Sequence, residues 1–289
     1  MDGSFDLSTI PELDRIAYYG ALFAMASVDG STDKDELNAV LELLDLDGMT
    51  EVGQRTVRAY ILDPPSLDDC IDRLSWGDDR LRFGVMFGLT EIAWANDIVD
   101  AAEEAALTAA QHQLGITDEQ RQKIDAFVQE ARRIEARGID DDYAAEALKK
   151  AASGLAAVGV PVAAVYFSGS VIGLSAAGIT SGLAALGLGL GMVPGIGVAI
   201  FIGIGLFWGI SKLLNIQRDR AREWTQAERE RKLQLVIRNL QDLINCLIDR
   251  INELQRESTA NGEAVRELKN RLQALQQLLA RRQQTPAPA

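Results

Sequence analysis

Acidic side chains gather at two places in the N-terminal half of the chain, and the two places resemble each other. Residues 28–36 read VDGSTDKDE, and residues 95–103 read ANDIVDAAE. Each segment follows an apolar helical pattern that ends in small residues, so each is predicted to join two helices. Oxygen donors at these spacings suit a hard cation such as calcium or magnesium. They equally suit the first turn of a helix, where carboxylates interact favourably with the helix dipole without any metal.

The repeated pattern resembles the tellurite-resistance TerB-like family, an all-helical domain with paired AxxDG-x5-E elements. The resemblance covers roughly residues 15–130 and implies a metal-associated acidic cluster, holding a divalent cation (calcium or magnesium) weakly. In the second copy, Asn96-Asp97 stands where the family usually has Asp-Gly, which removes the charge at position 96 and the glycine at position 97. The ligands that the resemblance implies are Asp29, Asp33, Glu36, Asn96, Asp100 and Glu103. Helix-start chemistry without a metal stays open as the alternative.

The elements that would position these side chains are helices between residue 8 and about residue 136. Apolar residues recur three and four positions apart, and no segment shows the sustained two-residue alternation of a strand. Thr50 and Ser66 are predicted to cap helix N-termini, and Thr117-Asp-Glu-Gln120 has the form of a capping box. The fold class is therefore predicted to be all-α, with an acidic helical domain over residues 1–137.

Residues for other chemistry are few. His112 is the only histidine, and neither Cys70 nor Cys246 has a basic residue beside it in the sequence. Two cysteines in separate segments form no zinc or disulfide framework, which favours a reducing compartment. We therefore expect a protein that is not an enzyme. A metal-dependent hydrolase that uses the acidic residues is the remaining enzymatic hypothesis.

Charge divides the chain unevenly. Residues 1–150 contain 32 acidic and 14 basic side chains, whereas residues 212–289 contain 10 acidic and 15 basic ones. The acidic half disfavours nucleic acid as a partner. The N-terminus lacks the apolar run of a signal peptide. We expect a cytoplasmic protein that is peripheral to the cytoplasmic membrane or inserted in it.

The membrane expectation comes from one long apolar stretch. Ala151 to Ser211 is 61 residues without a charged side chain, and a membrane-spanning helix needs only about 20. Small residues four apart let helices pack closely in lipid. Residues 138–214 are accordingly predicted to form a membrane-inserting helical hairpin, with a buried hairpin in a soluble bundle as the alternative. The glycines predicted to pack the helices are Gly169, Gly173, Gly178, Gly182, Gly187, Gly191, Gly205 and Gly209.

The last segment, residues 215–283, has the periodicity of a coiled coil and precedes a polar tail, residues 284–289, that we expect to be disordered. The predicted seam comprises Ile237, Leu240, Ile244, Leu247, Ile251 and Leu254. Isoleucine at a and leucine at d favour a parallel dimer. The short break around residues 258–262 equally permits an antiparallel hairpin within one chain, which we favour, combined with self-association.

Two functions are consistent with these parts. The first is a membrane-associated protein in which a TerB-like sensor or docking domain carries an insertable glycine-rich hairpin. More specific forms of this first hypothesis are an oligomerising α-helical pore former and a membrane-stress effector. The second is a soluble all-helical scaffold or interaction protein that keeps the apolar hairpin buried. The lipid bilayer is a partner only in the first.

Overall fold

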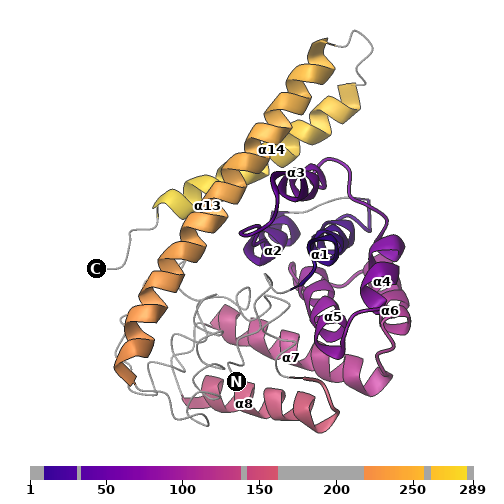
Figure 1. Ribbon diagram of the computed structural model, residues 1–289, viewed down its shortest axis with the longest axis vertical. Coiled ribbons are helices and arrows are strands. Elements are labelled where there is room, and N and C mark those ends of the chain that lie inside the picture. Colours follow the sequence, from indigo (N-terminus) through magenta and orange to yellow (C-terminus); the bar gives the residue numbers. More distant parts are fainter. Residues whose placement is uncertain (1–9, 31–33, 138–141, 162–217, 257–261, 285–289) are drawn as a thin grey trace.

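The computed structural model describes residues 10–30, 34–137, 142–161, 218–256 and 262–284. Regular secondary structure in these ranges is helical throughout, and the all-α prediction is confirmed for them. The helices are α1 (Glu12–Met25), α2 (Lys34–Leu43), α3 (Glu51–Ala59), α4 (Leu67–Ser75), α5 (Asp79–Ala93), α6 (Ala101–Gln113), α7 (Asp118–Arg137), α8 (Asp142–Ala157), α13 (Arg218–Arg256) and α14 (Gly262–Gln284) (Figure 1).

Polar caps begin several of these helices, as predicted. The Thr50 hydroxyl accepts the Gly53 N–H at 3.1 Å at the start of α3, and Ser66 does the same for Asp69 before α4. Thr117 and Gln120 form a reciprocal capping box, with distances of 3.2 and 3.0 Å. These bonds satisfy N–H groups that have no partner within their own helix, so the local sequence decides where the helices begin.

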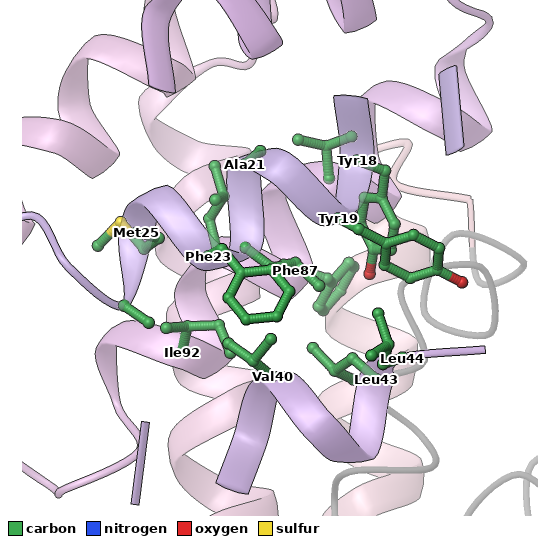
Figure 2. Packing of buried hydrophobic residues seen from close by; sticks show 14 of the residues in the cluster. Tyr18, Tyr19, Ala21, Phe23, Met25, Val40, Leu43, Leu44, Phe87 and Ile92 are labelled. Atoms are coloured by element: carbon green, nitrogen blue, oxygen red, sulfur yellow. The ribbon is translucent and has the colours of Figure 1, made fainter. Parts of the chain in front are cut away.

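Helices α1 and α5 form the centre of the N-terminal bundle. α1 contacts α2, α3, α4 and α5, while α5 also contacts α6 and α7. Figure 2 shows Tyr18, Tyr19, Phe87 and neighbouring aliphatic side chains filling the space between α1, α2 and α5. Gly88 permits the close approach of α5 to α1, because a Cβ there would lie 2.9 Å from the Tyr18 hydroxyl.

Helices α7 and α8 cover a further side of this centre. The Phe127 ring of α7 meets Phe87 edge-on, with ring centroids 5.8 Å apart. α8 packs on α7, and its fully buried Leu155 joins the same core. The Gln120 side chain also donates to the Val158 carbonyl at 3.1 Å, beyond the end of α8. α8 and Val158 just beyond it are thereby held to the bundle.

Helices α13 and α14 lie side by side in one chain and pass along α2 and α3 of the bundle (Figure 1). Four predicted seam residues are buried, while Ile237 and Leu254 are half-buried. α13 and α14 contact each other within one chain, while coiled-coil packing and self-association stay predictions. The buried four are Leu240, Ile244, Leu247 and Ile251.

Candidate functional site

The two acidic segments occupy equivalent helix junctions, α1–α2 and α5–α6. Gly30 has φ +85°, and Asp97, at the matching place of the second copy, has φ +65°. A non-glycine residue pays a conformational cost in this left-handed region. Arg132 holds the strained turn, donating to the Asp97 carboxylate at 3.1 Å and to the Ala95 carbonyl at 2.5 Å. At the matching position, the second junction therefore has the positive φ of the first without its glycine.

The structure brings one residue of each copy together. The Asn96 amide donates to the Glu36 carboxylate at 3.4 Å, a long hydrogen bond between residues 60 positions apart. Glu36 lies in the first turn of α2 and is only 5% exposed. Because an amide stands at position 96, this contact joins a donor to an acceptor and not two carboxylates.

The other predicted ligands have different surroundings. Asp100 is the N-cap of α6, and its carboxylate accepts the Glu103 N–H while the Glu103 carboxylate accepts the Asp100 N–H, each at 2.8 Å. Asp29 is exposed, and Asp33 lies outside the described residues. In the second copy the acidic pair thus performs helix capping, the alternative that the sequence left open.

The fit of these residues to a divalent cation is incomplete in the described part of the chain. No three histidine, cysteine, aspartate or glutamate side chains gather there in a way that could hold a metal ion. Calcium takes six or more oxygen ligands, and the described contacts supply hydrogen-bond partners instead. The divalent-cation site stays a prediction, and no chemical step is assigned to it.

A second polar cluster, which the sequence did not predict, surrounds the α2–α3 loop. Arg15 of α1 is 3% exposed, and its guanidinium donates to the Asp45 and Asp47 carbonyls at 2.8 and 2.9 Å. The Tyr19 hydroxyl donates to the Asp45 carbonyl at 2.5 Å and accepts the Asp45 N–H at 3.1 Å. Burial raises the pKa of Tyr19, so this hydroxyl keeps its proton. The signal in the sequence was an arginine on an otherwise apolar face of α1.

The same loop contacts the C-terminal hairpin. The Asn239 amide is 1% exposed and donates to the Leu44 carbonyl at 2.8 Å, just past the end of α2. Arg238 pairs with the Asp47 carboxylate at 2.6 Å. α13 therefore contacts the bundle through polar side chains as well as apolar ones.

Two further contacts lie over α3. Arg58 of α3 pairs with Asp242 of α13 at 2.6 Å, and the two side chains are 23% and 32% exposed. Arg271 of α14 donates to the Ile61 carbonyl at 2.7 Å, just past the end of α3. A cation at a helix C-terminus satisfies a carbonyl without a helical partner and interacts favourably with the dipole. We call these four contacts (Arg238–Asp47, Asn239–Leu44, Arg58–Asp242 and Arg271–Ile61) the clasp.

The cysteines offer no activated nucleophile. Both are free thiols; Cys70 is buried in the bundle and Cys246 is half-buried on α13. Burial raises the pKa of Cys70 to about 11 and also raises that of Cys246, so both stay protonated near neutral pH. A thiolate is the nucleophilic form of cysteine, and these surroundings disfavour it at both positions.

The glycines of the predicted membrane hairpin, Gly169 to Gly209, lie outside the described residues. Among the helices that are described, none combines the length and apolar character that crossing a membrane requires. Comparison with protein-family models, with curated proteins and with solved structures finds no match to this chain.

Proposed function

We propose that this chain is a non-enzymatic scaffold or interaction protein, in which an all-helical TerB-like bundle carries a C-terminal helical hairpin. The observation that supports it is the docking of that hairpin. Leu240, Leu243 and Leu275 of the hairpin belong to the same buried cluster as the bundle core. Two elements far apart in the chain thereby form one continuous helical surface, which is what a protein-binding scaffold presents to partners.

Two features support the TerB-like part of the proposal. The repeated junctions place a residue with positive φ at the same position, Gly30 and Asp97, and Glu36 of one copy contacts Asn96 of the other. These are relations that an internally repeated helical domain would have. In the scaffold proposal, the long apolar stretch is covered by protein and not by lipid.

The second candidate function is membrane insertion, and the uncharged stretch from Ala151 to Ser211 favours it. In this proposal the chain is a cytoplasmic-side membrane protein, and its sharpest version is an oligomerising pore former. GxxxG pairs in the stretch would pack helix on helix in lipid.

Liposome flotation with the full chain separates the two functions. In flotation, a scaffold stays in the bottom fraction of the gradient. In a separate test, carbonate washing of cell membranes releases it into the soluble fraction. A membrane protein floats, and Ile202→Arg abolishes flotation while the protein stays folded, because arginine at a helix centre costs about 2.5–3.5 kcal/mol of insertion. In the scaffold that same arginine is a buried charge and lowers the melting temperature. Leu186→Ile serves as the conservative control in both cases.

The divalent-cation proposal has its own test. Calcium at millimolar concentration would raise the melting temperature of the unmodified protein, and the Asp29→Asn/Glu36→Gln variant would lose that rise. An unmodified protein without any rise would leave helix capping as the whole role of these carboxylates.

A further inference from the structure

We infer that the α13–α14 hairpin is a releasable arm, which detaches from the bundle at the clasp while both the bundle and the hairpin stay folded. The inference deepens the scaffold proposal and rests on it only in naming which part of the scaffold moves. The observation that supports it is the set of contacts between the arm and the bundle, and above all the four polar contacts of the clasp.

The two helices of the arm contact each other far more extensively than either contacts the bundle. Ile251 of α13 is buried outside the cluster that includes the bundle core, so the arm has an apolar seam of its own there. A helical hairpin with such a seam has packing that does not depend on the bundle. The arm can therefore keep its own packing when its contacts with α2 and α3 are lost.

The boundary between the arm and the bundle combines the apolar packing of Leu240, Leu243 and Leu275 with the four polar contacts of the clasp. Each bond of the clasp joins groups that water can solvate: two carboxylates, two helix-terminal carbonyls, and the arginine and asparagine side chains that face them. Breaking such a bond exchanges it for a bond to water, so the clasp itself adds little to the cost of release. Most of that cost comes from exposing Leu240, Leu243 and Leu275, which share a buried cluster with the bundle core. The half-exposed Arg238–Asp47 pair adds least, because solvent and salt screen it.

Docking also leaves two buried polar atoms without a hydrogen bond. Asn239 Oδ1 and Arg58 Nε, both in the clasp, have no partner within the described part of the chain. A buried polar atom without a partner is destabilising, and release hydrates both atoms. These two unpaired atoms therefore destabilise the docked state at the clasp, as a releasable contact requires.

Labelling of the two native thiols distinguishes release of the arm from global unfolding. Cys246 lies on α13 one turn beyond Asp242, where burial raises its pKa and the Arg58 charge partly offsets that rise. Cys70 is buried between α1 and α4, with its Sγ 3.0 Å from the place where a Cβ on Gly20 would be. Release of the arm would expose Cys246 alone, whereas global unfolding would expose both thiols.

The test is the rate of thiol labelling of the full chain by a water-soluble disulfide reagent under native conditions. Arg58→Ala and Asp242→Asn each remove the Arg58–Asp242 pair, and we expect each to accelerate labelling of Cys246 by about tenfold while Cys70 keeps its parent rate. Glu253→Ala, which removes an ion pair within α13 (Arg250–Glu253), is the matched control and leaves both rates unchanged.

Using both variants separates release from a local effect on the thiol. Removing the Arg58 charge lowers the thiolate fraction of Cys246, so a purely electrostatic effect of Arg58→Ala would slow labelling, whereas release accelerates it. Acceleration in both supports release. Opposite changes, unchanged rates, or parallel acceleration of Cys70 and Cys246 would each overturn the inference. None of these readouts involves a binding partner or lipid, so the inference can fail while the scaffold proposal stands.

Discussion

The Asn96–Glu36 contact makes a prediction that separates helix-junction chemistry from metal chemistry. Asn96→Asp restores the acidic residue usual in the TerB-like pattern and keeps an oxygen for the Ile98 N–H, which Asn96 accepts at 3.0 Å. It also places a second carboxylate about where the amide now lies, 3.4 Å from the Glu36 oxygen. The change is nearly isosteric, so its effect is electrostatic.

The magnitude follows from that distance. Two unit charges at this separation repel by about 5 kcal/mol at an effective dielectric constant of about 20. The pair avoids part of this by sharing a proton, which raises the apparent pKa of the pair above that of an ordinary carboxyl group. We therefore expect a loss of about 2–4 kcal/mol in the free energy of unfolding at pH 7.

The raised pKa of the carboxylate pair determines how the stability loss of Asn96→Asp changes with pH. A carboxyl whose pKa is raised in the folded state destabilises that state once the unfolded chain has lost its proton. The loss is therefore full at pH 7 and shrinks as the pH falls towards about 4. Urea denaturation at pH 7 and at pH 5 measures it. If calcium bridges the two carboxylates, millimolar calcium restores the stability at pH 7.

The control is the exchanged pair, Glu36→Gln with Asn96→Asp, which again joins one amide to one carboxylate. Together with both single variants it completes a double-mutant cycle, and we expect the pair to regain most of the loss. An Asn96→Asp protein as stable as the parent at pH 7, with no pH dependence, would refute the contact.

Three further predictions concern stability. Asp100→Ala removes the cap of α6 and should lower the free energy of unfolding by about 1–2 kcal/mol in urea denaturation. Gly88→Ala should cost about 1–3 kcal/mol because its methyl group meets the Tyr18 hydroxyl, whereas Gly154→Ala in α8, with only Lys123 at 3.8 Å, should be neutral or stabilising; equal melting temperatures would contradict this. Stability should fall as the pH rises above about 9, since unfolded Cys70 ionises there while the pKa of the folded thiol is about 11. Cys70→Ala should flatten that decline between pH 8 and pH 10, and an unchanged slope would refute it.

The sequence alone determined the features that depend on neighbouring residues. Helical periodicity predicted the all-α class and the seam residues Leu240 and Leu247, which the structure buries. Capping side chains predicted where α3 and α4 begin, because an N-cap bonds a backbone group only three positions away. The resemblance between the two acidic junctions was also readable, since it is a repetition along the chain.

Only the tertiary structure decided which distant groups meet. Nothing local to Glu36 indicates that its hydrogen-bond donor is Asn96, or that Asp97 would adopt the backbone turn of a glycine. The contacts of the clasp could not be predicted from the sequence either. Asn239 and Leu44 are 195 positions apart, and in the sequence Asn239 is simply one polar residue on an amphipathic helix. Periodicity shows that a helix has an apolar face, but the partner of a polar group depends on how the helices pack. That packing is a property of the whole chain and not of any local pattern.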